Sequence, residues 1–235
     1  MMGVLRPQFG QPVARGAPRA TGCPVRHLEV ECRWQPSQLQ PNMPEGGLPW
    51  AELARQKLGG EGLAQTAFAH VVAVGTEVGI RFNFDRVASA PNTVDAHGLI
   101  LLASKHDRQW ETVDALFGAY FAEGRNLNDH DELAAIVAGS ELDAEEAREH
   151  LAGEEGTAEV RGCQEEAHAL GIQGVPCYAE DVRYAISGDQ PVEVFLRVFD
   201  HLYIGRVTRG WSGRGHKNSA RAGISLALSG KERRG

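Results

Sequence analysis

The amino-acid sequence predicts an α/β fold in which a small core of strands and helices is interrupted by a long, all-helical insertion. Three observations predict it. Apolar and polar residues alternate over 28–34, the period-two pattern of a strand with one buried face. Residues 49–170 instead repeat their apolar positions at helical spacing. Residues 171–191 read GIQGVPCYAEDVRYAISGDQP, where an apolar turn leads into two short strand-like segments separated by a polar break.

The elements can be placed in order along the chain. Regular structure is expected from His27 onward. The strand over 28–34 is followed by an extended, proline-rich run over 35–44. The first helix starts at Pro49 and Trp50, and Gly59-Gly60 ends it. The later helices are predicted at residues 61–79, 92–105, 108–123, 128–138, from 143 onward, 155–170 and 192–202.

Polar residues at the expected helix starts support several of these assignments. Asn92-Thr93 and Asn128-Asp129 can each cap a helix. Asp143 is followed three residues later by Glu146, which is the spacing of a capping box. Residues 177–180 and 184–187 are predicted to be the two strands of the hairpin.

Composition divides the chain into segments. We expect an irregular N-terminal segment over 1–26, a core over 27–48 and 158–203, a helical insertion over 49–157, and a basic, disordered tail over 204–235. Residues 1–26 carry four Arg and no acid, and residues 204–235 carry eight Lys or Arg and one Glu. Since the net charge is −7, about −18 is left for residues 27–203.

The two basic ends do not predict a nucleic-acid partner. Basic arms on an acidic body can bind nucleic acid or membrane surfaces, but neither end interleaves aromatic residues with its charges. We interpret both ends as disordered or spurious. The working hypothesis is that they are out-of-frame or mis-started translation of a high-GC gene.

The compartment expected from the sequence is the cytoplasm. The first 26 residues lack the apolar run of a signal peptide, and no segment approaches the ~20 apolar residues that span a bilayer. The four cysteines, Cys23, Cys32, Cys163 and Cys177, are scattered rather than arranged as a disulfide framework. Cys163 and His168 are five residues apart without further partners, so no metal site is expected.

Three groups of residues, found in one order, resemble the FrnE-like branch of the DsbA family in the thioredoxin superfamily. They are GIRFNFD at 79–85 followed by APNT at 90–93 and Ala96-His97, then LFGAYF at 116–121, and then residues 171–190. The resemblance implies a thioredoxin-like core with an all-helical insertion. It also implies thiol–disulfide exchange on protein or peptide substrates, as an oxidoreductase or isomerase without a cofactor.

The resemblance also implies a set of site residues. Pro176 would be the cis-proline of the family, and Val175, Pro176 and Cys177 would border the substrate groove. Asn92, Thr93 and His97 would begin the insertion helix that faces the active-site cleft, and we expect them to contact substrate. In the family mechanism a thiolate at the start of the first helix attacks the substrate disulfide.

The sequence departs from the family where that thiolate should be. The family carries Cys-Pro-x-Cys, whereas this chain has Cys23-Pro24-Val25-Arg26, with Arg26 in place of the second cysteine. Cys23 is therefore the candidate catalytic residue. Loss of the second cysteine would impair disulfide exchange by this chain. Cys177 replaces the usual aromatic residue, and Asp189 replaces the usual Ala.

Two alternatives remain open. Ser187-Gly188-Asp189 resembles the glutathione-binding loop of kappa-class glutathione transferases and hydroxychromene carboxylate isomerases, so Asp189 would hold the ammonium group of glutathione. Glutathione is then the one cofactor to consider. Alternatively, the chain is a pseudo-enzyme that uses the proline groove only to bind polypeptide. The sequence does not indicate an oligomeric state.

Overall fold

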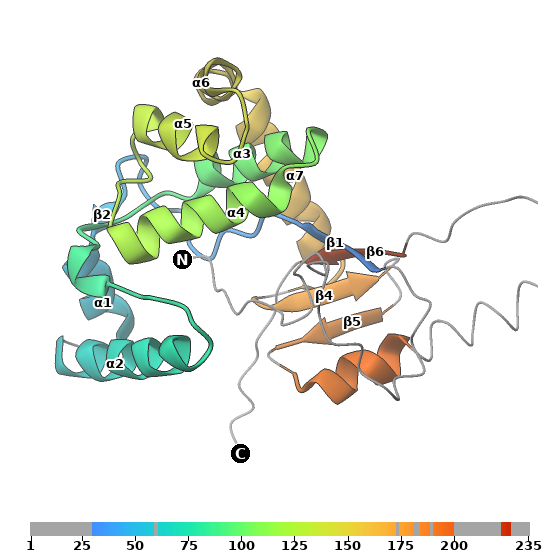
Figure 1. The fold of residues 1–235 in the computed structure, drawn as a ribbon, viewed down its shortest axis with the longest axis horizontal. Coiled ribbons are helices and arrows are strands. Elements are labelled where there is room, and N and C mark those ends of the chain that lie inside the picture. Colours follow the sequence, from blue (N-terminus) through green and yellow to red (C-terminus); the bar gives the residue numbers. More distant parts are fainter. Residues whose placement is uncertain are drawn as a thin grey trace, which may run out of the picture. The chain divides into compact units, whose positions relative to one another are not determined.

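The computed structural model describes residues 30–58, 61–172, 174–180, 184–188, 190–199 and 222–226. The first strand, the long series of helices, the hairpin and the helix after it follow the predicted order (Figure 1). The described residues fall into two compact units. The helical unit comprises residues 34–166, and the sheet unit comprises residues 30–33 and the described residues from Ala167 onward. None of the described helices is both long and apolar enough to cross a membrane.

The helical unit consists of helices joined by short connections. Its α-helices are α1 (Trp50–Leu58), α2 (Glu61–Glu77), α3 (Val94–Lys105), α4 (Gln109–Phe117), α5 (His130–Ala138), α6 (Ala144–Ala152) and α7 (Glu155–Ala169), of which the last three residues belong to the sheet unit. A 3-10 helix, η1 (Phe84–Arg86), and a π-helix, η2 (Gly118–Glu123), complete it. The two-residue strands β2 (Leu48–Pro49) and β3 (Ser89–Ala90) pair antiparallel, with Leu48 opposite Ala90.

Two of the predicted helix caps are confirmed. The carboxylate of Asp129 accepts hydrogen bonds from the first N–H groups of α5, and Asp143 does the same for α6. Each cap satisfies backbone donors that the helix itself cannot pair. α3 differs, because Thr93 makes no side-chain cap and the side chain of Asn92 accepts from the Val94 N–H instead.

The core of the helical unit forms where α3, α4 and α5 meet. Leu99, Leu116 and Leu133, one from each helix, are fully buried. Complete burial of such a side chain contributes about 1.5–3 kcal/mol. A second layer of the core is aromatic: Phe84 stacks on Trp50 and Phe68.

The long helix predicted over 108–123 is interrupted. α4 ends at Phe117, and the chain continues as the π-helix η2. Gly124 then ends the helix with φ 74°, a left-handed conformation that favours glycine. A Cβ atom there would collide with the carbonyl oxygen of Arg86. Glycine is therefore required for η1 and η2 to approach each other.

The sheet unit is built on a four-stranded sheet with the order β1-β6-β4-β5. β1 is Val30–Trp34, and β4 (Cys177–Glu180) and β5 (Tyr184–Ser187) form the antiparallel hairpin with Cys177 opposite Ser187. A helix over 192–199 follows the hairpin. Its Phe195 contacts Tyr178 of β4 edge to face, with ring centroids 4.9 Å apart.

The predicted disordered tail is corrected at one point. β6 (Ala222–Leu226) lies within it and pairs antiparallel with β4, with Ala179 opposite Ser225. The physical reason is visible in the sequence AGISL, where Ile224 and Leu226 alternate with Gly223 and Ser225 as in a strand. The remainder of 204–235 lies outside the described residues.

Candidate functional site

The loop before β4 is held by hydrogen bonds at both of its ends. α7 ends at Ala169, Gly171 in the turn after it has φ 75°, and the Ile172 N–H turns back to the carbonyl of Ala167 at 2.9 Å. The Val175–Pro176 peptide bond that follows is cis. The Pro176 carbonyl accepts a hydrogen bond from the Gly188 N–H at 2.7 Å, which ties the loop to the far end of β5.

Val175, directly before Pro176, is the residue that the resemblance places against the substrate backbone. Its side chain is half-buried, and the hydrogen bonds of the described residues include none to its backbone. An unpaired N–H and C=O beside a sheet can pair with an extended peptide. The geometry of Val175 thus fits the role that the resemblance implies.

Cys177, the first residue of β4, has its thiol in the core. The residue is 2 % exposed and packs with Ala167 and Ile172. Burial raises the pKa of this thiol, because the charged thiolate is disfavoured away from water. Cys177 is therefore a small buried hydrophobic residue in this structure rather than a nucleophile at the surface.

Cys163 is also a poor nucleophile. It lies in the middle of α7, far from the helix N-terminus that lowers a thiol pKa. Burial, together with the carboxylates of Glu166 and Glu159, raises its pKa. Within the described part of the chain, no group of three His, Cys, Asp or Glu residues could hold a metal ion.

Asn92 holds the start of α3 in place. Its Oδ1 atom accepts from the Val94 N–H and from Gln38 Nε2, both at 3.1 Å. Its Nδ2 atom donates to the Met43 carbonyl at 2.8 Å. These bonds fix the loop before β2 against α3, and they occupy the side chain that the sequence predicts to contact substrate. Its role toward substrate stays a prediction.

His97, one turn into α3, is buried and only partly satisfied. It is 5 % exposed, and its Nε2 atom has no hydrogen-bond partner. Burial lowers its pKa from 6.5 to about 4, although a hydrogen bond to the backbone of Ser37 acts in the opposite direction. The imidazole is therefore neutral at physiological pH. Its predicted contact with substrate stays a prediction.

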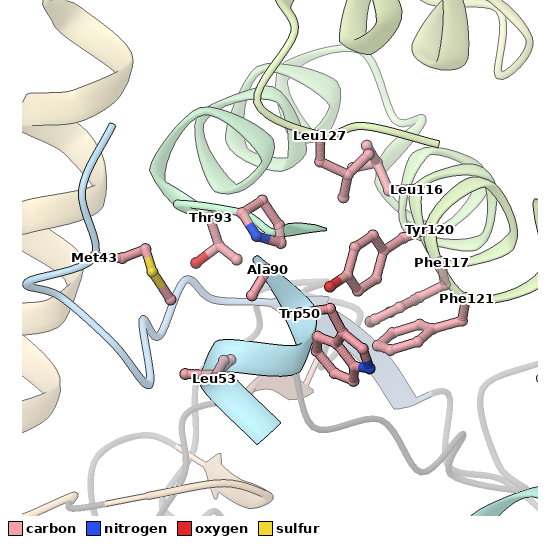
Figure 2. Close-up of a pocket in the computed structure, with 11 residues that line it drawn as sticks. Met43, Trp50, Leu53, Ala90, Thr93, Leu116, Phe117, Tyr120, Phe121 and Leu127 are labelled. Atoms are coloured by element: carbon pink, nitrogen blue, oxygen red, sulfur yellow. The ribbon is translucent and has the colours of Figure 1, made fainter. Parts of the chain in front are cut away.

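Thr93 lines an apolar pocket of the helical unit that the sequence analysis did not single out. The pocket has an empty volume of about 390 Å³, part of it open to solvent. Figure 2 shows Trp50 and Tyr120 close together in the wall, and the Tyr120 hydroxyl donates to the Ser89 carbonyl at 3.0 Å. The aromatic spacing over 108–123 was the available signal, but it indicates burial rather than a cavity.

Two of the predicted site residues, Cys23 and Asp189, lie outside the described residues. The structure therefore places Val175, Pro176 and Cys177 together in the sheet unit, and Asn92, Thr93 and His97 together in the helical unit. Cys32 lies in β1, and its side chain is not among those described.

Comparison with known proteins identifies the fold. Residues 17–200 match the DSBA-like thioredoxin domain. A solved structure of a probable DsbA oxidoreductase from Streptomyces coelicolor is 29 % identical, with a TM-score of 0.67, and the match covers 79 % of this chain and 81 % of that one. No curated protein sequence matches the chain significantly. The predicted thioredoxin-like fold with its all-helical insertion is confirmed.

Proposed function

Because the chain belongs to the DsbA-like thioredoxin domain family, we propose that it exchanges thiols and disulfides on polypeptide substrates as a member of the FrnE-like branch. The observation that carries the proposal is the loop before β4, where the backbone of Val175 has no hydrogen-bond partner among the described residues. A substrate strand binds there by pairing its own backbone with Val175. Affinity then depends little on substrate sequence, which suits an enzyme that acts on many disulfides.

The chemical step needs one thiolate. Its sulfur attacks one sulfur of the substrate disulfide, the S–S bond breaks, and the released substrate sulfur leaves as a thiolate that takes a proton from water. The product is a mixed disulfide between enzyme and substrate. An external thiol then resolves it, because this chain lacks a recognisable Cys-x-x-Cys pair. Such a chain works as an isomerase or a slow reductase and is impaired as a dithiol oxidase.

Cys23 is the proposed nucleophile. Cys163 and Cys177 are disfavoured because burial raises the pKa of both thiols, so little thiolate is present at neutral pH. The family match begins at residue 17 and therefore includes Cys23. The thiol of Cys32 is the remaining candidate by elimination.

Reduction of insulin by dithiothreitol tests the proposal. The chain should accelerate precipitation of the insulin B chain above a buffer blank, and Cys23→Ser should abolish the acceleration. Cys163→Ser is the matched control and should leave the rate within about twofold. Equal rates for the Cys23→Ser variant and the unaltered chain would assign the nucleophile elsewhere, and no acceleration by the unaltered chain would remove the catalytic proposal.

A non-catalytic binder is the second candidate, and the raised pKa of both described thiols favours it. It predicts no insulin reduction together with measurable binding of an unfolded, cysteine-free polypeptide. Glutathione binding is the third, and it depends on Asp189. Calorimetric titration of glutathione should then show at least a tenfold weaker affinity for Asp189→Ala, while equal heats for both proteins would remove this candidate.

A further inference from the structure

α2 has two apolar faces, of which the helical unit covers one. The covered face is formed by Ala64, Phe68, Val72 and Gly75, which are buried or half-buried. Phe68 and Val72 pack against the core of the unit. A surface helix of a globular protein normally has a single apolar stripe, about 100° wide. Figure 1 shows α2 beside α1, at the end of the unit away from α6.

The second face is exposed except at the half-buried Ala67, and we call it the outer stripe. It consists of Leu63, Ala67, His70, Val71 and Val74 of α2, and of Val78 in the turn directly after the helix, and these positions follow one another at helical spacing. Leu63 is 64 % exposed, Val78 53 %, Val71 39 % and Val74 37 %. At about 100° per residue these six positions share roughly 100° of the helix surface, next to the covered face.

The outer stripe is symmetrical about the midpoint between His70 and Val71. Leu63 and Val78 are equally distant from this midpoint along the sequence, and so are Ala67 and Val74. If two copies of α2 crossed antiparallel on a two-fold axis at this point, Leu63 of each copy would face Val78 in the turn that follows α2 of the other. The small Ala67 would likewise face the larger Val74. This is the self-complementary pattern that an isologous interface requires.

We propose that the outer stripe of α2 is a dimerisation surface, on which a second copy of this chain packs its own α2 in antiparallel orientation. The stripe contains no Asp, Glu, Lys or Arg, so its burial removes no such charge from water. α2 also has no Lys or Arg, the residues that hold an amphipathic helix on an anionic membrane. The chemistry of the stripe therefore favours a second copy over a lipid surface.

The exposed area sets the strength of the dimer. The four aliphatic side chains together expose the equivalent of about two complete side chains in each copy. Burying twice that amount falls short of the roughly 1,200–2,000 Å² of a standard stable interface. An interface of this size belongs with the weak, transient ones, so the dimer should form only at high protein concentration.

Sedimentation of the full chain tests the proposal directly. The average mass should rise from monomer toward dimer between about 5 µM and about 500 µM. Val74→Glu should keep the chain monomeric throughout, because a carboxylate would have to be buried against Ala67 of the second copy. Ala73→Glu, at an exposed position outside the stripe, is the matched control and should dimerise like the unaltered chain.

Disulfide cross-linking tests the register. The double variant A67C/V74C should form a covalent dimer on mild oxidation, with peptide mass spectrometry locating the link between residues 67 and 74. Within one helix these positions are about 10 Å apart along the axis, too far for a disulfide inside one copy. Each single variant should give no such dimer, because its two thiols would be about 10 Å apart across the axis.

Three results would overturn the proposal. They are a full chain that stays monomeric at about 500 µM, a dimer that Val74→Glu leaves intact, and cross-links at 67–67 or 74–74 in place of 67–74. A monomeric chain that Val74→Glu destabilises would show that another part of the same chain covers the stripe. Cross-linking needs no glutamate on the stripe, so it still decides the matter if Val74→Glu fails to fold.

Discussion

At the scale of single residues, Gln109 acts as a strand partner. Its Oε1 atom accepts from the Trp34 N–H at 2.7 Å and its Nε2 atom donates to the Trp34 carbonyl at 3.0 Å. The side-chain amide thus pairs both backbone groups of the last residue of β1. Leucine has nearly the same volume as glutamine but cannot form these bonds.

We expect Gln109→Leu to lower the free energy of unfolding by roughly 2–4 kcal/mol, since two partly buried backbone groups lose their partners. Urea denaturation measures the change. Gln56→Leu is the control, because Gln56 is exposed and bonds only to Glu52 within α1. Equal effects of the two substitutions would show that the pairing with Trp34 does not contribute to stability.

His150 packs against two glycines, Gly98 of α3 and Gly156 of α7. A Cβ atom at Gly156 would lie 2.5 Å from His150 Nε2, whereas one at Gly162 in the same helix would meet nothing within 4 Å. Gly162→Ala should therefore raise stability by about 0.5–1 kcal/mol, and Gly156→Ala should lower it by about 1–3 kcal/mol. Thermal unfolding distinguishes the two, and in a His150→Ala background the penalty at Gly156 should disappear.

His97 makes the stability depend on pH. Burial holds its pKa at about 4 in the folded protein, against 6.5 as the ordinary value. Between these two values the unfolded chain binds a proton that the folded chain does not, so stability falls as the pH falls from 6.5 toward 4. Above pH 6.5 the imidazole is neutral in both states, and this contribution is complete.

Between about pH 7 and about pH 4.5, the free energy of unfolding should fall in both proteins. The fall should be roughly 2–3 kcal/mol smaller in the His97→Gln variant than in the unaltered chain. Urea denaturation at the two pH values gives the comparison. The same replacement at the exposed His168 is the control. If His97→Gln showed the same pH dependence as the unaltered chain, His97 would bind a proton as readily in the folded protein as in the unfolded chain.

At the scale of elements, Asn92 joins three segments that are distant in the sequence. Its side chain bonds to Gln38, to Met43 and to the first turn of α3. Asn92→Ala should lower the free energy of unfolding by roughly 2–4 kcal/mol, because each lost partner leaves a half-buried polar group. Asn42→Ala, at an exposed position, should change it by less than about 0.5 kcal/mol in the same urea assay. If both substitutions lowered the free energy of unfolding by a comparable amount, the hydrogen bonds of Asn92 would not be important for stability.

Elements that depend on local chemistry were predictable from the sequence. Asp129 and Asp143 cap α5 and α6 as predicted, since a cap needs only a few neighbouring residues. The strands of the hairpin, Cys177–Glu180 and Tyr184–Ser187, also match the predicted ranges. The π-helix η2, the β2–β3 pair and the role of Gln109 were not predictable, because each depends on a contact between distant parts of the chain.

In the candidate site, too, features set by neighbouring residues could be predicted, whereas features set by distant contacts could not. The Val175–Pro176 loop could be located because its residues are contiguous and resemble a family. The unpaired Nε2 of His97, the occupied amide of Asn92 and the buried thiol of Cys177 could not, because burial and bonding are set by the surrounding elements. Residue identity indicates which chemistry is possible, and packing decides which side chains are free to perform it.

At the scale of the whole molecule, the sheet joins strands from both ends of the chain. β6 lies between β1 and β4, and it pairs with Tyr178, Ala179 and Glu180 of β4. Among the strands that the structure describes, β4 therefore has a neighbour on each side, whereas β5 has one. A chain that ends after residue 203 would leave one edge of β4 without its partner strand.

That truncation should make the amides of β4 exchange with solvent faster while those of α3 and α5 keep their protection. Backbone N–H groups that lose a ladder partner open to water more readily. Hydrogen exchange followed by peptide mass spectrometry measures both regions in one experiment, so the helical unit is the internal control. Unchanged protection of residues 177–180 would show that β6 does not stabilise the sheet.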